Sequence, residues 1–163
     1  MTLDASTLTA RRAQRADLPR LLELLADDVL GKQREAPMVG DPAYHGAIDT
    51  IDGDANQTLL VAQLEDRVVG MLQLTFIPGL SRRGAWRANI EAVRVDSALR
   101  GRGVGRWLMQ RAIDIAHQRG CRLVQLTSDR QRTDAHRFYS RLGFKDSQVG
   151  YKRALDGSQQ PDR

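Results

Sequence analysis

Cysteine, histidine and aromatic residues are scarce in this chain of 163 residues, which has one cysteine, three histidines and 5% aromatic residues. The single cysteine, Cys121, cannot form an internal disulfide and shares no paired ligand spacing with the histidines, so we expect neither a disulfide scaffold nor a metal site. No apolar run approaches the ~18 residues of a membrane span, and the first residues lack the layout of a signal peptide. We therefore expect a reducing, cytoplasmic setting and no membrane partner.

Basic charge is concentrated in the second half of the chain. Residues 98–153 carry 13 Lys or Arg and 4 Asp or Glu, whereas residues 1–97 carry 11 and 14. This asymmetry indicates either a solvated basic surface or contact with an anionic partner, such as nucleic acid or a phosphorylated cofactor. We expect no nucleic acid, because aromatic residues are few and neither a zinc finger nor an RNP box is present.

Apolar periodicity predicts both strands and helices along the chain. We expect strands at residues 8–14, 59–64, 68–77, 86–95 and 121–127, and one or two more within 144–155. We expect helices at 18–29, 104–120 and 135–142, with a weaker one near 43–51. No repeat or linker is visible, so the prediction is one α/β domain over residues 1–155, with a mixed, mostly antiparallel central sheet flanked by about four helices, and a flexible tail at 156–163.

A glycine-rich segment, RGRGVG at residues 100–105, lies between the predicted strand that ends at Val95 and the next predicted helix. Glycine lets backbone N–H groups approach an anion, and a helix N-terminus adds partial positive charge, so the segment is suited to phosphate. It is not a P-loop, because Arg106 and Trp107 stand where Lys and Ser or Thr are required. A dinucleotide-binding fingerprint that starts at Gly101 would need a glycine where Arg106 stands.

The segment instead resembles the pyrophosphate loop of the GNAT superfamily of N-acyltransferases, whose pattern is Arg/Gln-x-x-Gly-x-Gly/Ala. Arg100, Gly103 and Gly105 meet this pattern. A second signature of that family, a helix with A-x-x-F/L-Y that ends in a Gly-Phe turn, is similar to AHRFYSRLGF at residues 135–144. The chain is therefore identified as a member of this superfamily over residues 8–155.

The resemblance implies that acetyl-CoA is a co-substrate. Its pyrophosphate would lie on backbone amides of the glycine segment, and its pantetheine arm would pair with amides at the end of the preceding strand. The cofactor-binding residues implied in this way are Val93, Arg94, Val95, Arg100, Gly101, Arg102, Gly103, Val104, Gly105 and Arg106. Arg132 stands where many members have an Asn that holds the cofactor arm, and it could instead reach the 3′-phosphate.

Two residues are candidates for acid–base catalysis of amine acylation, which needs a deprotonated amine and a proton for the departing thiolate. Glu91 lies in an otherwise apolar strand, where a carboxylate is costly to bury unless it is paired or faces a cleft. The resemblance implies that Glu91 is the base, and a buried ion pair with Arg87 or Arg94 is the structural alternative. Tyr139 lies in the second signature, where the family's tyrosine points at the acyl sulfur. It is therefore the expected acid, and an ordinary core aromatic is the alternative.

The expected function is transfer of an acetyl group from acetyl-CoA to a primary amine, by direct attack within a ternary complex. The acceptor is a small-molecule or peptide amine that the sequence does not identify. The alternative function is a non-catalytic acyl-CoA sensor on the same fold, and a nucleic-acid-binding module is a weaker one. A homodimer would be the commonest assembly.

Overall fold

The computed structural model describes residues 4–27 and 40–155. They form two compact units, the first ending at Leu126 and the second beginning at Thr127. The expected end of the first helix, residues 27–29, reaches beyond the described residues after Asp27, and the predicted tail at 156–163 lies outside them altogether. No helix of the described part is long and apolar enough to cross a membrane.

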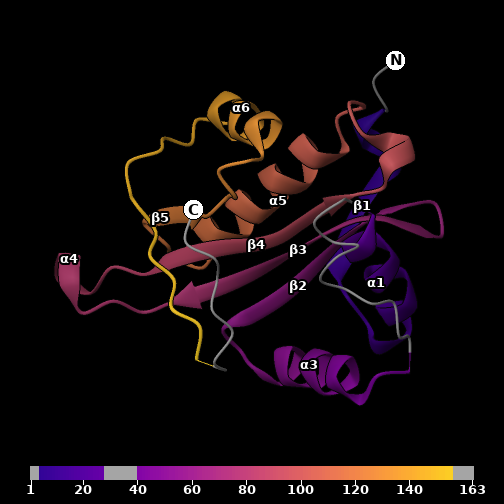
Figure 1. The fold of residues 1–163 in the computed structure, drawn as a ribbon, viewed down its shortest axis with the longest axis horizontal. Coiled ribbons are helices and arrows are strands. Elements are labelled where there is room, and N and C mark those ends of the chain that lie inside the picture. The colour runs from indigo at the N-terminus through magenta and orange to yellow at the C-terminus, as the bar shows by residue number, and fades with distance from the viewer. Residues whose placement is uncertain (1–3, 28–39, 156–163) are drawn as a thin grey trace. The chain divides into compact units, whose positions relative to one another are not determined.

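The first unit is built on a five-stranded sheet (Figure 1). Its strands are β1 (Leu8–Arg12), β2 (Gln57–Leu64), β3 (Arg67–Ile77), β4 (Arg87–Val95) and β5 (Leu123–Leu126). They lie side by side in chain order, with the first four antiparallel and β5 parallel to β4. The prediction of a mixed, mostly antiparallel sheet is confirmed.

Helices cover both faces of this sheet (Figure 1). On one side lie α1 (Leu18–Ala26) and α3 (Pro42–Gly53), which pack on the apolar side chains of β2 and β3. On the other side α5 (Val104–Gln118) packs on β3 and β4. Short 3₁₀ turns occupy Ala5–Thr7, Arg15–Asp17 and Ser97–Leu99.

Close packing under α5 requires a glycine at one point of β3. A Cβ atom added at Gly70 would lie 3.1 Å from the Arg94 carbonyl oxygen and 3.4 Å from a methyl group of Leu108. The helix therefore lies close to the sheet where β3 has no side chain. This places the beginning of α5 beside the end of β4, where the glycine segment connects them.

The connection between β3 and β4 is longer than the other hairpin of the sheet. Within it, Ser81–Gly84 forms one helical turn, α4, in which Arg82 and Arg83 have φ of 55° and 61°. The turn is therefore left-handed, a conformation that non-glycine residues adopt only as short exceptions. Leu80, just before it, has 98% of its surface exposed.

The described residues of the second unit, 127–155, contain one helix, α6 (Thr133–Arg141). The helix is followed by Leu142 as its C-cap and by Gly143, the glycine of the expected Gly-Phe turn, which has a φ of 88°. The expected strands within 144–155 are wrong, because the structure has no strand in these residues. Val149, Tyr151 and Leu155 are 64%, 93% and 95% exposed. The segment has some of the alternation of a strand but buries none of these three side chains, and a strand without paired neighbours is not stable in water.

Candidate functional site

The glycine segment folds as a tight loop between β4 and α5. Gly101 and Gly103 have φ of 73° and 95°, values in the left-handed region that glycine adopts without steric cost. Gly103 is also the N-cap of α5. The two glycines are therefore required by the backbone path, independently of any ligand.

The N-terminus of α5 leaves backbone donors without partners in the helix. Gly103 has no side chain that could cap the helix, and the first helical hydrogen bond is donated by the Trp107 N–H to the Gly103 carbonyl at 3.0 Å. The N–H groups of residues 104–106 precede that bond and are not used by the helix. Uncapped donors at the positive end of a helix dipole fit an anionic group such as a pyrophosphate.

Arg100 supports the loop from the side of α1. Its guanidinium donates to the Val95 carbonyl at 3.3 Å and to the backbone carbonyl of Asp27 at 2.9 Å. The Asp27 carboxylate in turn accepts from the Ser97 N–H at 2.9 Å. Arg100 is thus engaged with the protein itself, whereas Arg106 is exposed in the first turn of α5.

A buried carboxylate, Asp96, anchors the start of the loop. It is 6% exposed and accepts hydrogen bonds from Arg20 at 2.6 Å, from Arg67 at 2.7 Å and from the Ala98 N–H at 3.0 Å. Burial by itself would raise the pKa of Asp96, but the Ala98 N–H and the two guanidinium groups outweigh burial and leave the pKa lowered. Asp96 therefore stays charged and ties the strand end to α1.

A β-bulge divides β4 into two halves. On β3, Met71 is paired with Arg94 and Gln73 with Glu91. Two residues of β4, Ala92 and Val93, therefore lie opposite the single β3 residue Leu72. Ala92 has a φ of 51°, a conformation that is uncommon for a residue with a side chain. The bulge lies one residue beyond Glu91.

The two halves of β4 also differ in their second neighbour. β5 pairs with β4 from Arg87 to Ile90 only, and no described strand pairs on that side with residues 91–95. The predicted cofactor contacts Val93, Arg94 and Val95 all lie in this open half. Two carbonyls of this half accept from side chains, the Val93 carbonyl from Arg94 at 2.9 Å and the Val95 carbonyl from Arg100 at 3.3 Å. A strand edge that is not covered by another strand is a place where an extended ligand can pair in the manner of a β-strand.

Glu91 is exposed, and its side chain makes no ion pair with the other described residues. The alternative of a buried pair with Arg87 or Arg94 is therefore wrong. The physical reason is strand alternation: Ile90 is buried under α5 with 1% exposure, so the next side chain lies on the opposite face of the sheet. That face is covered by α1 and α3 only in part, which leaves the carboxylate in solvent.

In the second unit, Tyr139 packs within an aromatic group on α6 and the following turn. Its ring makes edge-to-face contacts with Phe138 at 5.3 Å and with Phe144 at 6.1 Å between ring centres. Arg132 is the N-cap of the same helix, and its carbonyl accepts from the His136 N–H at 3.1 Å. The second signature thus forms a compact local structure, as its sequence pattern indicates.

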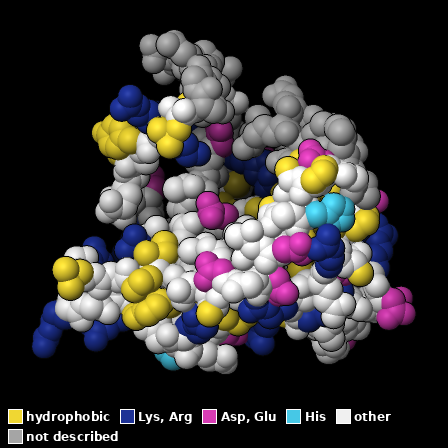
Figure 2. Space-filling model, turned by 90° about the horizontal axis from the view of Figure 1, so that it is seen from below, with side chains coloured by type: hydrophobic (Ala, Val, Ile, Leu, Met, Phe, Trp, Pro, Cys, Tyr) yellow, Lys and Arg dark blue, Asp and Glu magenta, His cyan; other side chains and the backbone are white. Residues whose placement is uncertain are grey.

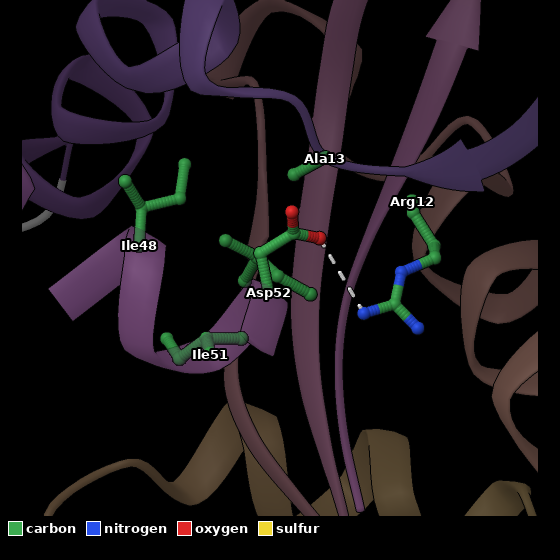
Figure 3. Close-up of a pocket in the computed structure, with 6 residues that line it drawn as sticks. Arg12, Ala13, Ile48, Ile51 and Asp52 are labelled. Carbon is green, nitrogen blue, oxygen red and sulfur yellow. Dashed lines mark ion pairs between the residues drawn. The ribbon is translucent and has the colours of Figure 1, made fainter. Parts of the chain in front are cut away.

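Two hollows of the first unit lie away from these residues. The smaller, of about 10 Å³, is lined by residues of β1, β2 and α3 and is closed by an ion pair between Arg12 and Asp52 at 3.6 Å (Figure 3). It has room for about one water molecule. The larger, of about 530 Å³, lies between α5 and the β1–β2 side of the sheet, with Arg111 and Asp114 on its helical wall. Neither is lined by Glu91 or by the glycine loop.

A family model described as the acetyltransferase (GNAT) family matches residues 19–144. The chain belongs to the GNAT family. The resemblance drawn from the glycine loop and the second signature is confirmed, and the predicted class of enzyme, an acetyl-CoA-dependent acyltransferase, agrees with it.

Individual GNAT relatives support this membership. An aminoalkylphosphonate N-acetyltransferase of Salmonella typhimurium is 34% identical over 63% of this chain and 66% of that protein, so the match spans just under two thirds of the relative. A glucosamine 6-phosphate N-acetyltransferase of Trypanosoma brucei brucei is 31% identical over 87% of this chain and 92% of that protein. A solved structure described as a transcriptional regulator from Bacillus halodurans C-125 is 48% identical, with a TM-score of 0.88, over 91% of this chain and 99% of that one.

Sequence reasoning missed the charged groups that hold the GNAT loop in place. Asp96 could have been found as a cap, because an Asp that directly follows a strand and precedes a turn is a typical capping signal. Arg20 and Arg67 gave no such signal, since they are 76 and 29 residues away from Asp96 along the chain. Their contribution depends on the packing of α1 against β3 and β4.

Proposed function

We propose that this chain transfers an acetyl group from acetyl-CoA to a primary amine by direct attack within a ternary complex. The observation that carries the proposal is the uncapped N-terminus of α5 behind Gly103, next to the open half of β4. The N-terminus of α5 offers donors for phosphate, and the open half of β4 offers a strand edge that no described strand covers. Acetyl-CoA has a pyrophosphate and an extended arm with amide groups, and it supplies the acyl group as a thioester.

The residues of this chain would divide the binding of the cofactor between them. The N–H groups of residues 104–106 would receive the pyrophosphate, and the backbone of Val93 to Val95 would pair with the amide-bearing arm. Arg106 and Arg102 would add positive charge near the phosphates. Arg100 would act indirectly, by holding the loop against Asp27.

Proton transfer is assigned to two side chains. Glu91 accepts the proton that the acceptor ammonium must lose before its nitrogen can form the new bond to the acyl carbon. Tyr139 donates a proton to the sulfur as the carbon–sulfur bond breaks. A covalent acyl-cysteine is disfavoured, because burial raises the pKa of the Cys121 thiol and so lowers its thiolate fraction at neutral pH.

The relatives indicate the kind of acceptor. Two of them are named for amines of low molecular weight, an aminoalkylphosphonate and glucosamine 6-phosphate. We extend only the common part of these names to this chain, a small primary amine. A peptide amine is the competing acceptor.

The proposal is tested by incubating the protein with acetyl-CoA and a panel of amines while the released thiol is measured. In the parent protein we expect turnover with at least one small amine. Tyr139→Phe should lower kcat roughly 100-fold, the usual range for one general acid, with little change in acetyl-CoA affinity. Glu91→Gln should lower the rate most at neutral pH and recover at high pH, where the amine loses its proton unaided.

Tyr151→Phe is the matched control, because Tyr151 is 93% exposed and belongs to no predicted signature. It should leave kcat and affinity unchanged. Parent-like rates in both Tyr139→Phe and Glu91→Gln would show that the acid and the base are assigned wrongly.

A second function, an acyl-CoA sensor without turnover, is favoured by one observation, the description of the 48% identical structure as a transcriptional regulator. The same panel separates the two. Binding of acetyl-CoA with no turnover for any amine, in a protein whose Glu91→Gln and Tyr139→Phe variants bind equally well, would support the sensor.

A further inference from the structure

Six polar side chains lie together on the face of the sheet that α1 and α3 cover only in part. We call them the polar row: Gln57, Gln73, Thr75, Asn89, Glu91 and Gln125. They come from four neighbouring strands. Figure 2 views the molecule from this side, where uncharged polar side chains and backbone lie among separate acidic and basic groups.

Hydrogen bonds join the first three members of the polar row. The Gln57 Oε1 atom accepts from Gln73 Nε2 and from Thr75 Oγ1, each at 3.0 Å. Gln57 lies opposite Thr75 in the β2–β3 register. The three side chains therefore lie on one face and hold one another in place.

The remaining members continue the polar row across β4 and β5. Thr75 is paired with Asn89 and Gln73 with Glu91, so these side chains stand next to each other on the same face. The Asn89 Oδ1 atom accepts from Gln125 Nε2 at 3.4 Å. The candidate base Glu91 is thus one end of a continuous polar surface.

The opposite face of the same strands is apolar. Leu72, Leu74 and Phe76 alternate with Gln73 and Thr75 along β3 and are at most 2% exposed under α5. An apolar residue at the Gln73 position would add to the partial core under α1 and α3, so polar side chains there are not required by packing. The polar row contains four side-chain amides that are half-buried, and burying an amide costs free energy unless it forms hydrogen bonds.

Several of those groups have no partner among the described residues. Gln57 Nε2, Gln73 Oε1 and Gln125 Oε1 make no hydrogen bond there, nor does the Glu91 carboxylate. They are available to a ligand that lies on the polar row. Such a ligand must offer both donors and acceptors.

We propose that the polar row binds the acceptor, and that the acceptor is an amine with several uncharged hydroxyl groups, such as an amino sugar or another amino polyol. This inference rests on the proposed acetyl transfer, which places the reacting amine beside Glu91. The rest of the polar row then contacts the part of the acceptor that does not react. Gln73 and Thr75 become residues that determine specificity.

Hydroxyl groups fit this surface better than other substituents. A hydroxyl both donates and accepts, as do the carboxamides and Thr75, so each pairing can be satisfied. A plain alkyl amine would desolvate the amides without pairing them. A carboxylate or phosphate only accepts, and it would lie near the Glu91 charge.

Arg87 is a cation that could make an acceptor with a phosphate bind better than one with hydroxyl groups alone. It follows the polar row on the same face of β4, two residues before Asn89 and opposite Ile77, and its side chain has no partner among the described residues. An acceptor with a phosphate could reach it from the polar row. Phosphorylated amines are therefore a separate arm of the test, with Arg87→Met as the variant that removes the cation.

The experiment compares kcat/KM for 2-amino-2-deoxyglucose and for cyclohexylamine, which has a six-membered ring without hydroxyl groups. In the parent protein we expect the sugar to be preferred by about 100-fold or more, because a site built for hydrogen bonds discriminates strongly against an analogue that lacks them. Gln73→Met keeps the side-chain length but removes the amide, and it should reduce this preference about tenfold. Thr75→Val should act in the same direction, and the KM for acetyl-CoA should not change in either variant.

Gln110→Met, on the exposed surface of α5, is the matched control and should keep the full preference. Three results would overturn the proposal: equal rates for the sugar and cyclohexylamine, preference for a tripeptide amine, or a strong preference for the 6-phosphate of the sugar that Arg87→Met abolishes. If no amine is acetylated, the proposed function has failed, and calorimetric titration of 2-amino-2-deoxyglucose into the protein with CoA decides about the polar row. Binding that Gln73→Met removes would support it, and absence of binding would overturn it.

Discussion

At the scale of single residues, two carboxylates of β4 and the loop after it, Asp96 and the candidate base Glu91, have different surroundings. Asp96 is buried and accepts hydrogen bonds from two guanidinium groups and one backbone N–H, whereas Glu91 is exposed and has no ion pair within residues 4–27 and 40–155. The two carboxylates therefore have different tasks. Asp96 fixes the backbone at the start of the glycine loop, and Glu91, the candidate base, is exposed to solvent.

The replacement Asp96→Asn should destabilise the protein by about 2 kcal/mol at neutral pH, since hydrogen bonds to a charged group are lost while Arg20 stays half-buried. The pKa of Asp96 is lowered in the folded protein. Its stabilising contribution is therefore complete above the carboxyl's ordinary pKa of about 3.9 and is lost as the pH falls below it. Urea unfolding at pH 7, 5 and 3.5 measures this.

The difference between parent and Asp96→Asn should be constant from pH 7 to 5 and should shrink at pH 3.5. Arg67→Gln is a useful comparison, because the Arg67 side chain is 65% exposed and its ion pair should contribute less than about 1 kcal/mol. A difference that did not vary with pH would mean that the charge of Asp96 is not what stabilises the loop.

At the scale of secondary-structure elements, the two ends of α5 have similar backbone features but different surroundings. Gly103 at the N-terminus and Gly120 after the C-terminus both have positive φ, at 95° and 78°. About 22 Å of helix separates them, at 1.5 Å per residue. Only the first lies where the helix dipole and free N–H groups favour an anion.

The two glycines with positive φ provide a matched pair of variants that tests the glycine loop as the cofactor site. Gly103→Ala and Gly120→Ala should each destabilise the protein by about 1 kcal/mol, because an L-residue in the left-handed region is strained. Only Gly103→Ala should weaken acetyl-CoA binding, by about tenfold or more, since relief of the strain would move the N–H groups of α5. Calorimetric titration measures both affinities. Equal affinity in the two variants would place the phosphate site elsewhere.

At the scale of the whole molecule, the charge of the chain is divided along the sequence. The positive excess of residues 98–153 begins with the loop and α5 in the first unit and continues through α6 in the second. A polyanionic cofactor that binds the folded chain would offset part of this self-repulsion. It should therefore stabilise the molecule as a whole.

Acetyl-CoA at about 100 times its Kd should raise the free energy of unfolding by about 2.7 kcal/mol. For a chain of this length, Tm should then rise by roughly 5–10 °C. Thermal unfolding with acetyl-CoA measures this, and NAD at the same concentration is the control for a general effect of phosphate groups. A rise in Tm with NAD and none with acetyl-CoA would contradict the proposal that this loop binds acetyl-CoA.

Local features could be read from the sequence because short-range interactions determine them. The amphipathic pattern of Val104, Leu108 and Ala112 predicts α5 within two residues of its observed end, and the positions of Gly101 and Gly103 predict a tight turn at its start. The hairpin of β2 and β3 follows in the same way from two apolar runs around a polar turn. The helix depends on neighbours three or four residues away, and the hairpin on two segments that follow each other directly in the chain.

Tertiary structure alone decided the features that depend on pairing between distant segments. The bulge at Ala92 results from the register of β4 against β3. The exposure of Glu91 depends on how far α1 and α3 extend over the sheet. Residues 144–155 show the same limit, because their alternating pattern becomes a strand only where another strand offers hydrogen bonds. The polar row is the clearest case: its six residues span positions 57 to 125, and only the register of four strands brings them onto one face.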